Sequence, residues 1–554
     1  MIRRHQHITD LSVLCKKAGI EQIIISPGSR NAPLTNTFFA AFGKGCHSIV
    51  DERSAAYVGL GMARNLQKPV VIISTSGTAV LNYSPAIAEA YYQRIPLIVV
   101  TADRPSKWID QQDNQTIRQQ EVYRNFIVKS LSLPEEYTAE TLQQTHLDIA
   151  EIIELAKAMS GPVHINVPLD EPLYGELPAP SEMLFNAFEN SEEPGQIPAE
   201  LKEQWEKAGS ILLIHGQDFP NKKLQQTFSA LASDKRMVAI AENISNLSDD
   251  ILIDQPELMI WHSDKENLPA PDLLIYAGGQ VVSKQLKVLI RKWKIKNTWR
   301  VGIDLFEMDT FTQQNQFAKI SAADAYTQLA ENIQTGADNE FKQTWLSSYK
   351  NAREKAVKIS SGLSFSDPAA LQILLNNLPE ETILELGNSS VIRYSQLLPG
   401  VKNHIQYANR GVSGIDGCLS SAVGTALTTR QPTLAILGDL SFVYDSNALW
   451  NRELAGNLKI VVFNNEGGGL FGLIPGPSSQ AAFNDFFVAH HPVQLQKLAE
   501  AFHLNYFCAN DPASLNKQLK PFFEVSERPA LLEIKTDQHI NKEAFFRLIG
   551  KNNS

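Results

Sequence analysis

The chain has 554 residues, of which 43% are hydrophobic, and a formal net charge of -10. This length and composition predict a large globular protein with several domains. The acidic balance argues against nucleic acid as a partner, because phosphate binding needs clustered Lys and Arg. No apolar run reaches the roughly 20 residues that span a bilayer, and no signal-peptide core follows the first residues. We therefore expect a cytoplasmic protein that is not integral to a membrane.

The first third of the chain alternates β-branched runs with helical patterns. Strands are expected over 22–26, 48–50, 70–74 and 97–101, and helices over 53–65 and 78–92. This alternation predicts a parallel α/β domain over residues 1–178. The Pro-rich, acidic segment 177–198 is predicted to be a linker.

A second α/β pattern follows, with strands expected over 211–214, 237–241, 273–276 and 299–303. It predicts a smaller central domain over 199–355. A polar helical stretch, roughly 338–358, leads from it to the third domain. Gly278-Gly279 is too short for a dinucleotide fingerprint. A third α/β domain is expected over 360–554. The four cysteines lack Cys-x-x-Cys spacing, which argues against a zinc site or a disulfide framework.

The third domain carries the most informative motif. A strand-like run, 434–437, ends in Gly438-Asp439-Leu440-Ser441, and a second, 459–463, ends in an Asn-Asn-Glu-Gly turn. Residues 444–454 read as one helix, so a right-handed strand–helix–strand unit would bring both tips to one sheet edge. A carboxylate from Asp439 and an amide from Asn465 suit Mg²⁺. The alternative is that these residues only cap a helix and form a turn.

This spacing resembles the diphosphate-binding signature of thiamin-diphosphate (ThDP) enzymes, although Leu440 stands where the general form has glycine. Gly-Asp-Leu-Ser is similar to the form in the menaquinone-pathway synthases of 2-succinyl-5-enolpyruvyl-6-hydroxy-3-cyclohexene-1-carboxylate (SEPHCHC). The resemblance implies three parallel-sheet α/β domains in a ThDP-binding fold, with Mg²⁺ or Mn²⁺ held by Asp439, Asn465 and the Gly467 carbonyl. The other implied cofactor contacts are Gly438, Leu440, Ser441, Leu470 and Phe471.

A carboxyl group precedes a helix of small residues in the first domain, at Asp51-Glu52-Arg53. By the resemblance, Glu52 is the catalytic glutamate that binds the aminopyrimidine of ThDP and promotes its reactive tautomer. Alone, Glu52 would only favour the helix dipole. Ile415, within 409–417, matches the apolar residue that bends the cofactor. Its alternative role is core packing.

Several arginines at expected strand tips indicate a ligand with more than one carboxylate, because Arg binds carboxylate in a bidentate manner. Individually, each could be a solvated surface charge. By the resemblance, the substrate is contacted by Ser29, Arg30, Arg104, Gln115, Lys284, Ser389, Arg393, Arg410 and Ile474. Gln285 stands where the family usually has arginine.

The resemblance implies that 2-oxoglutarate is decarboxylated and its four remaining carbons are added to isochorismate. It also implies a homodimer or homotetramer with active sites between subunits. Two alternatives remain at this stage. One is another ThDP decarboxylase or carboligase, such as an acetohydroxyacid synthase or a pyruvate oxidase, and the other is a cofactor-binding protein that has lost catalysis.

Overall fold

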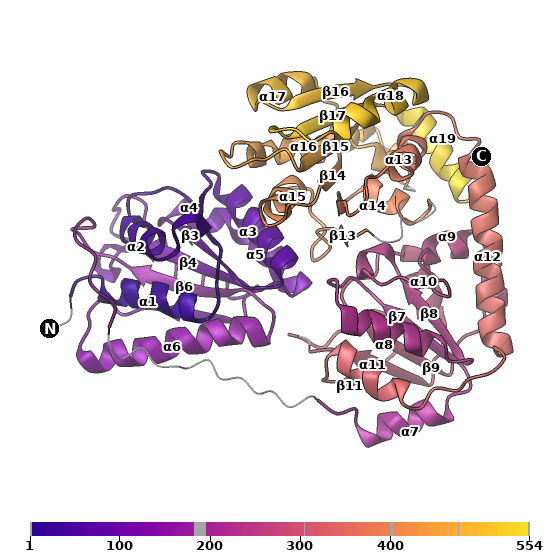
Figure 1. The fold of residues 1–554 in the computed structure, drawn as a ribbon, viewed down its shortest axis with the longest axis horizontal. Coiled ribbons are helices and arrows are strands. Elements are labelled where there is room, and N and C mark those ends of the chain that lie inside the picture. Colours follow the sequence, from indigo (N-terminus) through magenta and orange to yellow (C-terminus); the bar gives the residue numbers. More distant parts are fainter. Residues whose placement is uncertain (1–2, 182–194, 304, 399–403, 475, 552–554) are drawn as a thin grey trace. The chain divides into compact units, whose positions relative to one another are not determined.

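Three parallel sheets with helices on their faces make up the chain (Figure 1), which confirms the expected α/β architecture. The computed structural model describes residues 3–181, 195–303, 305–398, 404–474 and 476–551. Contacts divide the chain into two compact units. The first unit contains 1–191, 409–430 and 443–458, and the second contains 192–408, 431–442 and 459–554. The three domain boundaries expected from sequence stay predictions, and most of the expected linker lies outside the described residues.

The first unit is built on sheet A, whose strand order is β2-β1-β3-β4-β6-β5. Its two long central strands are buried on both faces, which explains their unbroken runs of Val and Ile. The strands are β1 (Ile23–Ile25), β2 (Cys46–Ser48), β3 (Val70–Ser74), β4 (Leu97–Asp103), β5 (Lys129–Ser132) and β6 (Val163–Pro168). The helices are α1 (Gln6–Lys17), α2 (Ala32–Phe42), α3 (Glu52–Leu66), α4 (Thr78–Asn82), α5 (Ser84–Gln93) and α6 (Ala139–Ala158).

Sheet B, in the second unit, has the order β11-β10-β9-β7-β8 and packs an apolar cluster on each face. Its strands are β7 (Ile211–His215), β8 (Met237–Ala241), β9 (Leu273–Ala277), β10 (Asn297–Val301) and β11 (Gln316–Ala318). Its helices are α7 (Ala199–Lys207), α8 (Lys222–Ala232), α9 (Pro256–His262), α10 (Lys284–Lys292) and α11 (Ala322–Ala330), followed by the long α12 (Glu340–Ser360).

Sheet C has the order β13-β12-β14-β15-β17-β16. Its strands are β12 (Ile383–Leu386), β13 (Gln406–Tyr407), β14 (Thr433–Gly438), β15 (Leu458–Asn464), β16 (Asn505–Ala509) and β17 (Ala530–Lys535). Helices of this part of the chain are α13 (Asp367–Leu375), α14 (Ser390–Tyr394), α15 (Cys418–Leu427), α16 (Asp439–Tyr444), α17 (Leu495–Ala501), α18 (Pro512–Phe523) and α19 (Gln538–Leu548). Because β14 and β15 are neighbours, their ends lie at adjacent positions along one sheet edge.

Several expected elements differ from the structure. The single helix expected over 444–454 is wrong: α16 ends at Tyr444, and a 3-10 turn, Ser446–Leu449, follows. The chain turns there because the Asp445 carboxylate accepts hydrogen bonds from the backbone and hydroxyl of Ser420. The helix expected over 78–92 is two helices, with a proline in the first turn of α5. The strand expected over 48–50 is β2, which ends at Ser48.

Within the second unit, polar side chains join sheet B to sheet C. The Asn246 side chain donates to the Gln406 carbonyl (3.0 Å) and accepts from the Gln406 amide (2.8 Å). The Gln217 side chain donates to the Ala408 carbonyl (2.8 Å). These bonds attach the edge strand β13 of sheet C to the turns of sheet B, and both sheets belong to one compact unit.

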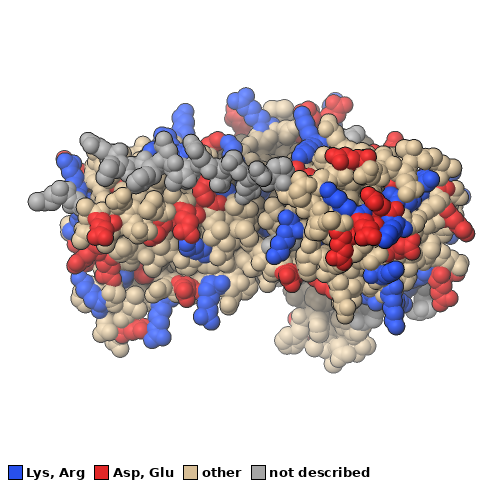
Figure 2. All heavy atoms as spheres, turned by 90° about the horizontal axis from the view of Figure 1, so that it is seen from below, with Lys and Arg blue, Asp and Glu red and all other residues tan. Residues whose placement is uncertain are grey.

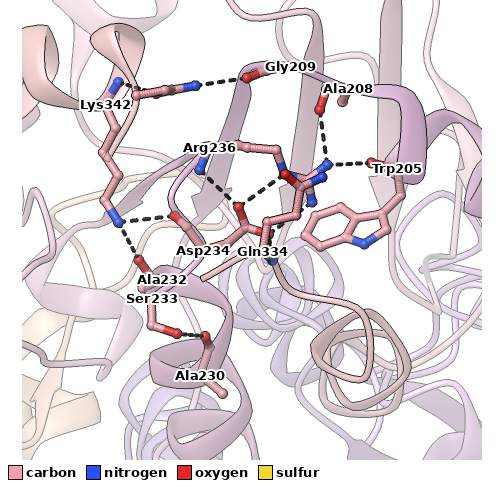
Figure 3. A network of polar contacts seen from close by, with 11 residues as sticks. Trp205, Ala208, Gly209, Ala230, Ala232, Ser233, Asp234, Arg236, Gln334 and Lys342 are labelled. Atoms are coloured by element: carbon pink, nitrogen blue, oxygen red, sulfur yellow. Dashed lines mark hydrogen bonds and ion pairs between the residues drawn. The ribbon is translucent and has the colours of Figure 1, made fainter. Parts of the chain in front are cut away.

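A buried ion pair organises the beginning of the central sheet (Figure 3). The Asp234 carboxylate accepts from Arg236 at 2.9 and 3.0 Å, and both side chains are almost fully buried. Arg236 also donates to the carbonyls of Trp205 and Ala208 at the end of α7. Lys342 donates to the carbonyls of Ala232 and Asp234. The network therefore satisfies carbonyls at two helix ends with buried cations.

The surface of the described part of the chain carries both signs of charge. On the face drawn in Figure 2, Lys and Arg side chains are interspersed with Asp and Glu. None of the helices within the described ranges combines the length and the apolar character needed to cross a bilayer.

We expect Asp234→Ala to lower the free energy of unfolding by about 3–5 kcal/mol, because it leaves the buried Arg236 guanidinium without its carboxylate. Urea unfolding followed by tryptophan fluorescence measures the change. The control is Glu203→Ala, which removes the partner of Lys207 in a solvated pair of α7 and should have little effect. Equal effects of the two substitutions would contradict the structural role of the buried pair.

Candidate functional site

The ends of β14 and β15 meet at the carboxyl edge of sheet C. The Asp439 side chain is buried, and its Oδ2 accepts a hydrogen bond from the Gly467 amide at 2.9 Å. Its Oδ1 accepts from the Leu440 amide at 2.7 Å. Gly467 has φ +143°, and a Cβ there would lie 2.6 Å from the Val488 carbonyl oxygen, so only glycine fits. The two expected loops are therefore fixed against one another.

Asn465 orients its amide at this edge. Its Nδ2 donates to Asp367 Oδ2 at 3.0 Å, and Gln538 donates to its backbone carbonyl at 2.8 Å. Its Oδ1 is buried without a hydrogen-bond partner among the described residues. An acceptor in this state is costly unless something binds it. The site thus presents one carboxylate and one open amide oxygen.

Burial raises the pKa of both acids in this region. The pKa of Asp439 is raised by desolvation, and that of Asp367 is raised to about 6 by desolvation, with a further contribution from the Asp439 charge. A bound cation would favour the ionised form of both groups. The donor set therefore fits a hard divalent cation, with oxygens of the kind Mg²⁺ prefers. The described residues contain no cluster of three or more His, Cys, Asp or Glu side chains arranged for a metal. The ligand set expected here is different, because it consists of one carboxylate, one side-chain amide and one backbone carbonyl.

The remaining residues of the two loops surround this pair. Ser441 is buried, Gly438 and Leu440 are half-buried, and no atom lies within 4 Å of a Cβ added at Gly438. Leu470 and Phe471 lie in a 3-10 turn, Gly469–Gly472, where Leu470 packs partly on the core of sheet C. Ile474 follows and is 37% exposed. Leu470 is only partly buried in the core, so it could also contact a cofactor.

Two residues near the loops were missed in the sequence. Asp367 begins α13 after Ser366, a pattern that reads only as a helix start. His491 places Nε2 3.4 Å from Asp439 Oδ2, with its side chain 12% exposed. A cavity of about 430 Å³ beside Asn464 is also lined by His491 and by the buried Glu533. Neither residue has a spacing signal, because the tertiary fold brings them to the site.

Glu52 is the first residue of α3 in the first unit. Asp51 caps the helix by accepting from the Ser54 amide at 2.9 Å. Within the described ranges, the Glu52 carboxylate makes no hydrogen bond or ion pair, and its charge acts on the buried Tyr83, whose pKa is raised chiefly by burial. The Glu52 side chain is half-buried. Its carboxylate is therefore available to accept a hydrogen bond from a ligand.

Close packing of α3 against α15 supports this helix. A Cβ at Gly61 would lie 2.0 Å from the Ser421 carbonyl oxygen, and one at Gly424 would lie 2.1 Å from that of Val58. The small residues noted in the sequence thus allow two backbones to touch. Arg53, next to Glu52, donates to the Tyr444 carbonyl at 2.9 Å and lies over the Tyr444 ring.

The loop with Arg410 and Ile415 is clamped by a buried acid of α5. The Glu89 carboxylate accepts from the amides of Gly411 (2.6 Å) and Val412 (2.7 Å). Burial raises the pKa of Glu89, although these bonds oppose the shift. Arg410 and Ile415 are both half-buried. No motif in the sequence points to Glu89, since it reads as an ordinary helix residue.

The structure brings two of the expected arginines close together in the first unit. Arg30 is buried and donates to the Leu169 carbonyl at 3.0 Å. Its pKa is lowered by burial and then by the charge of Arg104. Arg104 pairs with Asp113 at 3.2 Å. Ser29 and Gln115 are exposed, and Gln115 has φ +53° beside Gly77. Two neighbouring guanidiniums favour an anionic ligand.

In the second unit, Ser389 is the N-cap residue of α14, and Arg393 lies within that helix. Ser389 has φ +72° and Arg393 is exposed. Lys284 is the exposed first residue of α10, where Ser283 caps the helix. The neighbouring Gln285 side chain accepts from Lys265 at 2.7 Å. The Lys265 ammonium group therefore lies next to the glutamine that stands where the family usually has arginine.

The turns after β7 and β9 bond to each other at the centre of sheet B. The Gly279 amide donates to the Gln217 carbonyl (2.6 Å), and the Gln217 amide donates to the Gln280 carbonyl (3.0 Å). A Cβ at Gly216 would lie 2.1 Å from the Gly279 carbonyl oxygen. This is the point of the sheet where open α/β proteins commonly bind ligands. Here, these backbone groups are engaged with the protein itself.

Several known proteins and protein families are similar to this chain. Residues 9–122 match a family described as "Thiamine pyrophosphate enzyme, N-terminal TPP binding domain", and 387–534 match its "C-terminal TPP binding domain". The chain is 42% identical to the SEPHCHC synthase of Desulfotalea psychrophila, over 97% of this chain and 99% of that relative. It is 37% identical to the SEPHCHC synthase of Flavobacterium johnsoniae, over 94% of each.

A solved structure of benzoylformate decarboxylase from Polynucleobacter necessarius is similar in fold. The TM-score is 0.69 at 16% sequence identity, covering 97% of this chain and 99% of that one. At this identity the likeness concerns the fold alone.

Asp445, which turns the chain after α16, makes stability depend on pH. Burial raises its pKa from 3.8 to about 7. Between these values the unfolded chain binds fewer protons at this position, so the free energy of unfolding should fall as the pH rises. Asp445→Asn can still accept from the Ser420 amide, and its NH₂ group can donate to the Ser420 hydroxyl. This variant should flatten the pH dependence, as urea unfolding from about pH 4 to pH 8 would show. Identical pH profiles for the two proteins would contradict the assignment.

Proposed function

Since the chain belongs to the SEPHCHC synthase family, we propose that it joins 2-oxoglutarate to isochorismate with loss of CO₂, using ThDP and a divalent cation. The products are SEPHCHC and CO₂, and the reaction is a step of menaquinone biosynthesis. The observation that carries this proposal is the edge of sheet C, where Asp439 is bonded to the turn that contains Asn465 and Gly467.

The cation would be held by Asp439, Asn465 and the Gly467 carbonyl. Support comes from the open, buried Oδ1 of Asn465 and from the raised pKa of Asp439, which burial causes. The diphosphate of ThDP would be contacted by Gly438, Leu440 and Ser441, because their backbone lies at the start of α16. Mg²⁺ and Mn²⁺ both suit this oxygen set.

When bound, ThDP supplies the nucleophilic carbon that adds to the oxo group and accepts the electrons released with CO₂. The chain's contribution begins with Glu52, whose carboxylate would accept a hydrogen bond from the aminopyrimidine ring. Its freedom from other donors in the described structure supports this role. Ile415 would bend the cofactor, and Leu470 and Phe471 would cover it and exclude water.

Both proposed substrates are dianions, and the chain has a set of cations for them. The pair Arg30 and Arg104 is the best supported, because the two charges already act on each other without a ligand. The further substrate contacts would be Ser29, Gln115, Lys284, Ser389, Arg393, Arg410 and Ile474. Lys265, bonded to Gln285, would add a positive charge next to Lys284.

The rival ThDP enzymes are less well supported. Acetohydroxyacid synthases and pyruvate oxidases act on smaller monoanions, for which this arginine set is excessive. The turns of sheet B that a nucleotide would approach are bonded to each other. A chain that has lost catalysis would have no reason to keep Glu52 together with both cation ligands.

We also propose that the active form is a cytoplasmic homodimer or homotetramer with ThDP bound between subunits. Large apolar side chains exposed on the first unit, such as Tyr444 (56%) and Trp450 (57%), support a covered surface there.

The direct test is to incubate the purified chain with ThDP, Mg²⁺, 2-oxoglutarate and isochorismate. We expect a product with the mass of SEPHCHC and one CO₂ per product. Glu52→Gln should retain ThDP but form product at least about 100-fold more slowly, since its amide cannot take part in the proton shift of the pyrimidine. Turnover of pyruvate in place of 2-oxoglutarate, or a Glu52→Gln variant as active as the parent, would contradict the proposal.

Arg104→Ala should lower kcat/KM for one of the two substrates by roughly 10- to 100-fold, because a charge-assisted bond to carboxylate is lost. The matched control is Arg118→Ala, on the same segment, since the Arg118 side chain is 82% exposed and its guanidinium pairs with Asp110. Steady-state kinetics with each substrate varied in turn would separate the two variants. If both lose the same activity, Arg104 has no specific role in substrate binding.

A further inference from the structure

The amide of Asn465 can face the cofactor loops with either oxygen or nitrogen, and only oxygen binds a cation. We propose that Asp367 is the positioning residue that decides this orientation, an inference that rests on the proposed function. Asp367 is 1% exposed, and its Oδ2 accepts from Asn465 Nδ2 at 3.0 Å. A carboxylate has no hydrogen to donate, so it selects the NH₂ side of the amide.

The direction of this bond is set by the groups behind Asp367. Thr536 donates its hydroxyl hydrogen to Asp367 Oδ1 at 2.5 Å. Asn541 in turn donates to Thr536 Oγ1 at 3.1 Å and accepts from the Asp367 amide at 2.7 Å. Both carboxylate oxygens of Asp367 therefore accept, and a reversed Asn465 amide would place two acceptors against one another.

The other side of the amide is consistent with a bound cation. Asn465 Oδ1 is buried and has no hydrogen-bond partner among the described residues. The backbone of Asn465 is held separately, because Gln538 donates to its carbonyl at 2.8 Å. Rotation about the side chain is thus the freedom that remains, and Asp367 removes it. Asp367 also begins α13, but that role alone would not require a bond to Asn465.

Asp367→Asn tests the proposal, because the new amide can donate as well as accept and no longer selects one orientation. We expect the Kd of ThDP, measured by calorimetry at fixed Mg²⁺, to rise about 10- to 100-fold, as for other residues that orient metal ligands. Thr536→Val removes one donor to Asp367 without touching Asn465 and should cause a smaller rise. Thermal unfolding verifies that each variant is folded.

The decisive variant exchanges the two groups, as Asp367→Asn with Asn465→Asp. Its carboxylate at 465 can bind the cation and accept from the amide at 367, whose oxygen still accepts from Thr536. We expect the Kd of ThDP to return to within about threefold of the parent. A purely structural need for a carboxylate at 367 would give no such recovery.

Asp511→Asn is the matched control, since it removes one negative charge from an exposed helix cap that asparagine fills equally well. It should leave ThDP binding unchanged. The positioning role of Asp367 is overturned if Asp367→Asn binds ThDP as tightly as the parent, or if the exchanged variant binds it as weakly as Asp367→Asn. Neither result contradicts the proposed function. A parent that does not take up ThDP, or an Asp439→Ala variant that binds it equally well, overturns the proposed function and this inference with it.

Discussion

The hydrogen bond from the Gly467 amide to the Asp439 carboxylate is the constraint on which the site depends. It joins the ends of β14 and β15, two neighbouring strands of sheet C. Because the bond uses one oxygen of a buried carboxylate, it fixes the side chain and also the turn that follows Asn464. Gly467 allows this only through its positive φ, since a side chain would meet Val488. A small change in this turn would therefore displace the whole oxygen set.

Buried acids recur where the chain holds a turn or a loop in place. Asp367 holds Asn465, Glu89 holds the loop before Ile415, and Asp445 holds α15 against the segment after α16. In each case the carboxylate accepts at least two hydrogen bonds, and burial raises its pKa. Such groups favour a single loop conformation at a cost in desolvation. We infer that the fold gives up stability to keep these loops rigid.

Sheet B has a different character, because most of its buried polar side chains form hydrogen bonds with the backbone at the ends of its own helices and strands. Arg236 and Lys342 donate to carbonyls at the ends of helices, and the Asp234 carboxylate accepts from Arg236. Glu242 accepts from the amides of Val282 and Ser283 just before Lys284. Burial raises the pKa of Glu242 to about 7. These contacts fix the turn before Lys284, so the sheet would serve as a rigid support for the proposed substrate contact.

The sequence by itself determined the three parallel sheets, since buried strands of Val and Ile alternate with helices, and it placed Asp439 and Asn465 at strand ends. Short motifs and strand ends are local properties, and a parallel sheet brings such ends to one edge. The sequence did not determine the break after Tyr444 or the roles of Asp367, Glu89 and His491. Each of these depends on a partner far along the chain, such as Ser420 for Asp445 and Thr536 for Asp367. Only the tertiary structure brings those partners together, because burial turns an ordinary polar residue into one that fixes a loop.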